Sequence, residues 1–163
     1  MKVEALMTRI VTTCRPEDTL DRVARVMWDV DCGCVPVVQA NGEAPTVVGM
    51  ITDRDICMAA YTQGRPLAEI HVSTTMSQEV CSCGPRDTVQ QALKILQTKQ
   101  LHRLPVIDDH GQLVGMIALA DVVREAMHEG TKASRAEMAE SIAKTLGAIS
   151  APRSPRREVV AAA

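Results

Sequence analysis

The feature that most constrains the fold of this chain is an internal repeat. Residues 7–38 match residues 76–107 without a gap, at a shift of 69 residues (76 minus 7). After a loop that differs by three residues, 48–51 match 114–117 at a shift of 66. One copy alone would leave a face of its sheet uncovered, so the repeat predicts two copies that pack face to face and fold together.

Within each copy the apolar periodicity changes in the same order, which predicts an α/β fold of two β-α-β-β-α repeats related by a pseudo-two-fold axis. The expected elements of the first repeat are a strand at 10–13, a helix from about 19, a hairpin of 35–38 and 46–51 turning at Asn41-Gly42, and a helix at 53–62. Those of the second are a strand at 79–82, a helix from about 88, a hairpin of 104–107 and 113–117 turning at 109–111, and a helix at 119–128.

Helical spacing also predicts which side chains form the core. The expected core faces are Leu20, Val23, Ala24, Met27 and Val30 in the first repeat, and Val89, Ala92, Leu93 and Leu96 in the second. We expect the first repeat to span 1–66, the second 67–130, and a C-terminal helix and loose tail 131–163. That helix is expected at 134–146, with Gly147 as its stop signal and the tail from 151.

Composition excludes several classes of function. The formal charge is -2, and clustered Lys and Arg are lacking, which argues against a nucleic-acid partner. No apolar run is long enough to span a membrane, and the first residues lack the apolar core of a signal peptide, so we expect a cytoplasmic protein. We find no nucleophile with a base, paired acids or phosphate loop, and we predict no enzymatic activity.

Three motifs carry a resemblance to a known family. They are Leu6-Met7-Thr8 with Thr75-Met76-Ser77 at the repeat starts, the segment 102–108 (HRLPVID), and the segment 49–55 (GMITDRD). Together with the repeat, they make residues 6 to about 128 resemble a pair of cystathionine-beta-synthase (CBS) domains, a Bateman module. The resemblance implies two clefts between the repeats, often occupied by AMP, ADP, ATP or S-adenosylmethionine, and frequent homodimers.

The resemblance implies one strong site. Thr52 and Asp55 match the family's Gly-x-x-Thr-x-x-Asp segment and are expected to hold the ribose, although a carboxylate at that position also caps a helix. His102 and Arg103 are expected to face ligand phosphates, and an Arg side chain grips phosphate well. The adenine is expected beside Met50, Val80 and Cys81, which would otherwise be plain core residues.

The second cleft is expected to be weak or empty. It keeps Asp121 for the ribose, with Val11 and Thr12 near the base. However, Ala118 replaces Thr52, and Gly33-Cys34 stands where the other repeat has His102-Arg103. The second cleft therefore lacks a hydroxyl and cationic donors.

Three functions stay open. The first is a regulatory sensor that binds an adenosine nucleotide, requires no other cofactor, and changes its contacts with an unknown protein partner or within a homodimer. The second is an interaction scaffold whose clefts stay empty and whose C-terminal helix docks. The third is a cysteine-based metal or redox module, since Cys32-Gly33-Cys34 and Cys81-Ser82-Cys83 are Cys-x-Cys pairs. Their spacing is unusual for a metal site, and we expect free thiols and no metal.

Overall fold

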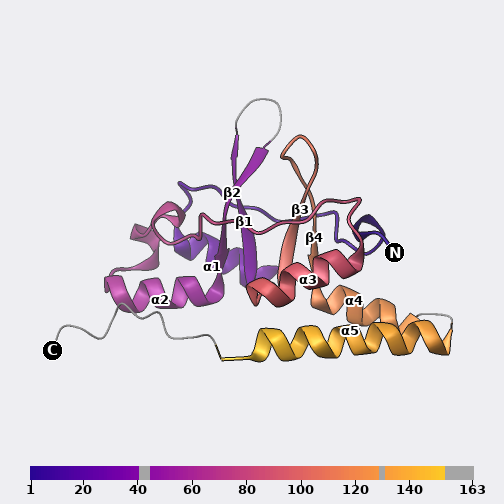
Figure 1. Ribbon diagram of the computed structural model, residues 1–163. Helices are drawn as coiled ribbons and strands as arrows, with labels where there is room; N and C mark the ends of the chain where they lie inside the picture. Colours follow the sequence, from indigo (N-terminus) through magenta and orange to yellow (C-terminus); the bar gives the residue numbers. More distant parts are fainter. Residues whose placement is uncertain (41–44, 129–130, 153–163) are drawn as a thin grey trace.

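Each repeat folds around an antiparallel hairpin, and the computed structural model places the two hairpins side by side with helices packed below them (Figure 1). The structure describes residues 1–40, 45–128 and 131–152. The first lobe contains α1 (Leu20–Asp29), β1 (Cys34–Ala40), β2 (Pro45–Thr52) and α2 (Asp53–Gln63). The second contains α3 (Val89–Lys99), β3 (Arg103–Ile107), β4 (Leu113–Ala118) and α4 (Leu119–His128). The predicted α/β class and the pair of repeats are confirmed.

The first expected strand of each repeat is reduced to a single bridge. Cys14 pairs in parallel with Val37, and Cys83 pairs in parallel with Val106. Residues 10–13 do not form a strand because the chain there passes from one lobe to the other. Thr8 pairs with Met116 in the second lobe, so the intervening residues extend neither hairpin.

The lobes are joined because each contributes a segment to the core of the other. The N-terminal segment, with the short helix Val3–Ala5, buries Val3 and Met7 in the core of the second lobe. The linker, with the short helices Leu67–Glu69 and Val72–Thr74, buries Ile70 and Val72 in the core of the first lobe. Neither lobe has a complete core without the other's segment.

The predicted core faces are largely correct. All four residues predicted on α3 are buried. On α1, Leu20, Val23 and Met27 are buried and Ala24 packs half-buried against them, but Val30 is 49% exposed. Val30 lies beyond the last helical residue, Asp29, so the helical period no longer aims its side chain at the core.

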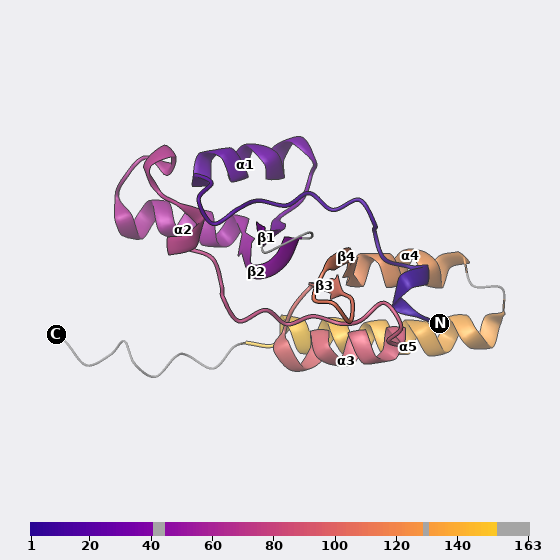
Figure 2. The same cartoon turned by 90° about the horizontal axis from the view of Figure 1, so that it is seen from above.

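The C-terminal helix α5 (Lys132–Ser150) is longer than expected and continues through Gly147. It packs along α3 and α4, as Figures 1 and 2 show from two directions. Burial of Ile149 beyond the glycine offsets the roughly 1 kcal/mol cost of glycine within a helix. The Asn41-Gly42 turn and the tail from residue 153 lie outside the described residues.

Within the part of the chain that the structure describes, no helix is both long and apolar enough to cross a membrane.

Candidate functional site

Thr52 and Asp55 lie where β2 ends and α2 begins, and they form a reciprocal helix cap. The Thr52 backbone N–H donates to Asp55 Oδ2 at 2.9 Å, and the Thr52 hydroxyl donates to the same oxygen at 2.7 Å. In return, the Asp55 N–H donates to Thr52 Oγ1 at 3.2 Å. The helix-capping role that the sequence left open for Asp55 is therefore present, and Thr52 takes part in it.

The cap occupies only one oxygen of the Asp55 carboxylate. Among the described residues, Oδ2 accepts both bonds from Thr52 and Oδ1 accepts none. Asp55 is half-buried and lines a hollow of about 240 Å³ with Thr62 of α2 and with Thr74 and Thr75 of the linker. A carboxylate oxygen beside such a hollow can accept from hydroxyl groups of a ligand.

Arg103 of the second lobe lies close enough to the first lobe to affect its electrostatics. Burial raises the pKa of the Cys34 thiol to about 11, while the Arg103 guanidinium acts to lower it and the carboxylates of Asp55 and Asp53 act to raise it further. Cys34 pairs with Thr52 across the hairpin, and its counterpart in the repeat is Arg103 itself. A cation from one lobe and carboxylates from the other thus act on one half-buried thiol.

Cys34 and Thr75 were not expected in the first cleft. Cys34 appeared as half of a Cys-x-Cys pair and, with Gly33, as a residue that replaces His102-Arg103 in the second cleft, and Thr75 appeared only as part of a repeat-start motif. Alignment of the two repeats nevertheless contains the signal for Cys34, because residues that are equivalent under a pseudo-two-fold axis approach each other where they lie near that axis.

The other residues expected in the first cleft are more widely distributed. Met50 uses its backbone to pair with Ser77, with two N···O distances of 2.9 Å. Val80 and Cys81 are half-buried, and Cys81 packs against the core of the second lobe. His102 is exposed, and its carbonyl accepts the N–H of Leu119 at 3.0 Å. Their role in ligand binding stays a prediction.

The second cleft differs at its carboxylate. Asp121 is only 9% exposed, its Oδ2 accepts the N–H of Ala118 at 2.7 Å, and its Oδ1 forms an ion pair with Arg124. Val11 is half-buried and Thr12 exposed. A ligand that binds Asp121 must compete with Arg124, whereas Asp55 has no such partner among the described residues.

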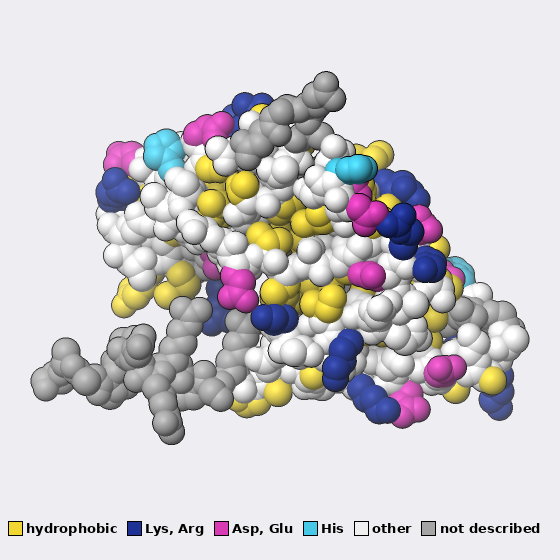
Figure 3. All heavy atoms as spheres, turned by 45° about the horizontal axis from the view of Figure 1, so that its top comes forward, with side chains coloured by type: hydrophobic (Ala, Val, Ile, Leu, Met, Phe, Trp, Pro, Cys, Tyr) yellow, Lys and Arg dark blue, Asp and Glu magenta, His cyan; other side chains and the backbone are white. Residues whose placement is uncertain are grey.

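Figure 3 shows one face where the two lobes meet. Hydrophobic side chains gather across its middle, and carboxylates and cationic side chains lie around them. An apolar surface with a few polar groups at its edge is the usual composition of a small-molecule site.

The cysteines do not converge on a metal site. Among the described residues, no group of three or more His, Cys, Asp or Glu side chains is placed to hold a metal ion. All six thiols are free. Burial is also the main cause that raises the pKa of Cys14 to about 12 and of Cys83 to about 11, which keeps both thiols protonated at neutral pH.

Comparison with known proteins places the chain in a family. The CBS domain model matches residues 3–61 and again 68–128. The CBS domain-containing protein YhcV of Bacillus subtilis is 34% identical over 125 residues, covering 77% of this chain and 85% of that protein.

Two solved structures extend the comparison. Hypoxic Response Protein I, solved with two coordinated zinc ions, is 26% identical with a TM-score of 0.67, covering 76% of this chain and 98% of its own. The CBS domain pair of protein MJ0100, solved with 5-methylthioadenosine and S-adenosyl-L-methionine, is 18% identical with a TM-score of 0.69, covering 80% and 98%. With both repeats matched by the family model, the chain belongs to the CBS domain family.

Proposed function

We propose that the chain is a regulatory module that binds an adenosine nucleotide in the cleft that contains Asp55. The observation that carries this proposal is the Asp55 carboxylate beside the hollow lined by Thr74 and Thr75, because its Oδ2 keeps the helix cap while its Oδ1 accepts no hydrogen bond among the described residues. The adenosine ligands in the MJ0100 structure support the ligand class, because that protein has the same fold.

The residues suit the parts of such a ligand. Asp55 Oδ1 would accept from the ribose hydroxyls while Oδ2 keeps the helix cap, and Thr52 would keep the carboxylate in place. Arg103, with the more exposed His102, would bind phosphate oxygens. Adenine would lie against Met50, Val80 and Cys81. Because these groups come from both lobes, binding would favour one relative arrangement of the lobes and alter contacts with a partner.

The expected affinity fits a metabolite sensor. At roughly 0.3 kcal/mol per heavy atom, a ligand of AMP size, with about 23 such atoms, gains about 7 kcal/mol of binding free energy, which corresponds to a Kd of about 10 μM.

The proposal assigns no catalytic step to the chain. It includes a homodimer, a cytoplasmic location and an unidentified protein partner as further expectations.

The test is calorimetric titration with AMP, ADP, ATP and S-adenosylmethionine. Asp55→Ala should weaken the best ligand by about 3 kcal/mol, since two charge-assisted hydrogen bonds are lost. Asp121→Ala is the matched control, and it should leave that affinity unchanged because the equivalent carboxylate belongs to the other cleft. Thermal unfolding of both variants shows whether they stay folded.

The outcomes separate the candidate functions. Binding that survives Asp55→Ala contradicts the ribose assignment, and binding lost only with Asp121→Ala moves the site to the second cleft. Absence of binding for all four ligands favours the scaffold function instead.

A further inference from the structure

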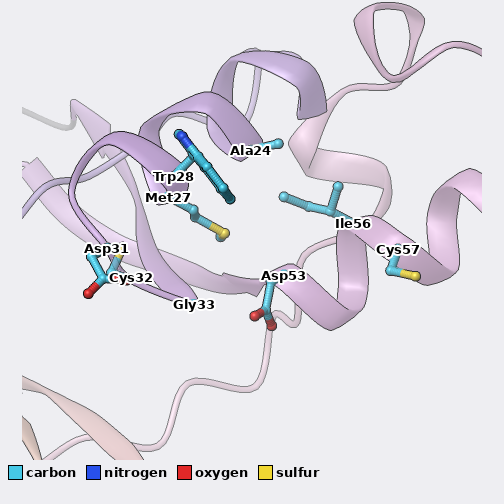
Figure 4. Close-up of a pocket in the computed structure, with 9 residues that line it drawn as sticks. All are labelled: Ala24, Met27, Trp28, Asp31, Cys32, Gly33, Asp53, Ile56 and Cys57. Carbon is cyan, nitrogen blue, oxygen red and sulfur yellow. The ribbon is translucent and has the colours of Figure 1, made fainter.

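The helix α2 has two distinct faces in the first lobe. One faces α1 across a hollow of about 430 Å³, and Figure 4 shows Ile56 of α2 pointing toward Met27 of α1 there. The other carries Asp55 and Met58, which both line the smaller hollow of about 240 Å³. Because these two residues are three positions apart, their side chains are neighbours on the helix. Met58 is therefore the helical neighbour of the carboxylate that is proposed to hold the ligand.

The second lobe has an arginine at the position of Met58. At the shift of 66, Asp55 corresponds to Asp121 and Met58 to Arg124. Arg124 forms an ion pair with Asp121 Oδ1, whereas Asp55 Oδ1 accepts no hydrogen bond among the described residues. The Arg124 side chain is 70% exposed, and that of Asp121 is 9% exposed. An exposed cation thus occupies the carboxylate oxygen that stays available in the first lobe.

The segments beside the two carboxylates differ in the same direction. Thr74 and Thr75 of the linker line the Asp55 hollow, and at the shift of 69 they correspond to Ala5 and Leu6. Leu6 packs against the core of the second lobe. Two hydroxyl groups that can bond to a polar ligand are thus replaced by apolar side chains. Asp121 has its partners within the protein, while the surroundings of Asp55 suit a polar ligand.

We propose that Arg124 is an internal ligand of Asp121, and that the residue at this helical position determines whether a cleft accepts a nucleotide. Arg124 keeps the second cleft closed, and Met58 leaves the first cleft open. This inference rests on the proposed function, because it gives both carboxylates the same contact with a ribose. It implies that one chain binds one nucleotide, since a ligand of the second cleft must first displace the guanidinium.

The two positions can be exchanged without altering the core. Met58 is 48% exposed, and the Arg124 side chain is more exposed still. Met58→Arg places a cation at the same spacing from Asp55 that Arg124 has from Asp121. Arg124→Met removes the cation and retains a long side chain. The pair of substitutions should therefore reverse the properties of the two clefts.

The first cleft is measured by calorimetric titration with AMP, ADP, ATP and S-adenosylmethionine in turn. Met58→Arg should weaken the best ligand about fivefold, which is the upper end of what an exposed ion pair contributes. Met58→Gln is the matched control, because glutamine is polar and long but uncharged, and it should leave the affinity unchanged. The difference between the two variants should shrink as salt is raised, since salt screens the added charge.

The second cleft is measured with the same compounds in the Asp55→Ala background, where the first cleft is disabled. Arg124→Met should tighten the remaining binding about fivefold. Arg124→Lys, which keeps the cation, should not. Adding Ala118→Thr to Arg124→Met should tighten it further, because it restores the hydroxyl that Thr52 donates to Asp55.

Arg22→Met is the control for loss of an arginine. Arg22 is 72% exposed and pairs with Asp18, which is 13% exposed, at 3.0 Å, and neither residue is expected in a cleft. Its affinity in the Asp55→Ala background should equal that of Asp55→Ala alone. Thermal unfolding of every variant shows whether it stays folded.

Unchanged affinity of the second cleft after Arg124→Met, or equal affinities for Met58→Arg and Met58→Gln, would overturn the proposal. So would tighter binding by Met58→Arg, because the new guanidinium would then contact the ligand rather than Asp55. The nucleotide proposal fails separately, if Asp55→Ala leaves binding intact or the unmodified chain binds none of the four compounds. Binding gained only with Arg124→Met would then still support the role of Arg124, and absence of binding in every variant overturns both proposals.

Discussion

The two lobes have the same arrangement of helices and strands but differ in what covers their helices. In the second lobe α5 covers α3 and α4, and Thr145 and Ile149 are buried in that contact. In the first lobe the equivalent face keeps Trp28 and Tyr61 exposed at 88% and 82%. The two repeats therefore share their core positions but differ at a few surface positions. As a result, α5 covers the helical face of the second lobe, and the equivalent face of the first lobe stays exposed.

The clefts show the same contrast at single positions. Asp121 is paired with Arg124, and the position of Arg124 in the first repeat is occupied by Met58, at the shift of 66. The methionine cannot neutralise Asp55, so that carboxylate stays available. One substitution between the repeats thus separates a carboxylate used for structure from one suited to a ligand.

The largest effect that tests this contrast is expected at the α5 contact. Ile149→Ala should lower the free energy of unfolding by roughly 2–4 kcal/mol, because it removes a buried side chain from the second core. Trp28→Ala should change it by less than about 0.5 kcal/mol, since the ring is exposed. Denaturant titration measures both. Similar losses in the two variants would mean that the first lobe's face is not open in solution.

A smaller effect is expected where the lobes exchange segments. A Cβ at Gly115 would lie 2.9 Å from the Thr8 carbonyl oxygen, and one at Gly49 would lie 3.0 Å from that of Ser77. Gly115→Ala and Gly49→Ala should each cost roughly 1–3 kcal/mol, because backbone atoms must shift.

Gly147→Ala is the control for these glycines. Among the described residues, no atom outside the adjoining backbone of α5 lies within 4 Å of its added Cβ, so the change should stabilise α5 by roughly 0.5–1 kcal/mol. Equal effects at Gly115 and Gly147 would show that the crossing segments do not pack closely on the strands.

The apolar periodicity predicted much of this fold, because the helices, hairpins and helix caps depend mainly on residues that lie close together in the chain. The second helix of the second repeat was expected at 119–128 and is observed as Leu119–His128, and the hairpins lie where alternation placed them. Thr52 and Asp55 were expected together at a helix start, and their spacing of three residues forms the cap.

Long-range packing determined the features that the sequence did not predict. Nothing in the periodicity of residues 1–8 indicates that Val3 and Met7 complete the core of the other lobe. The extension of α5 past Gly147 depends on Ile149 reaching that same core. The spacing of three residues between Asp121 and Arg124 permits an ion pair along a helix. The pair matters because Asp121 is buried, and burial depends on tertiary packing that the sequence pattern does not show.

The smallest expected effect compares the first helices of the lobes. Thr88 caps α3 in a reciprocal box with Gln91, in which Gln91 N–H donates to Thr88 Oγ1 at 3.2 Å and Thr88 N–H donates to Gln91 Oε1 at 2.7 Å. Thr19 precedes α1 but its side chain makes no cap bond; the hydrogen bond of Thr19 with the Asp21 carboxylate is instead the main cause that lowers the pKa of Asp21.

Thr88→Ala should therefore cost about 1 kcal/mol of unfolding free energy, and Thr19→Ala only a few tenths. Thermal or denaturant unfolding of the two variants, measured against the unmodified chain, gives the difference directly. Equal losses would mean that α1 is capped in solution by Thr19 and that the two lobes begin their helices alike. A loss confined to Thr88 would extend the contrast between the lobes from their surfaces to the way each helix starts.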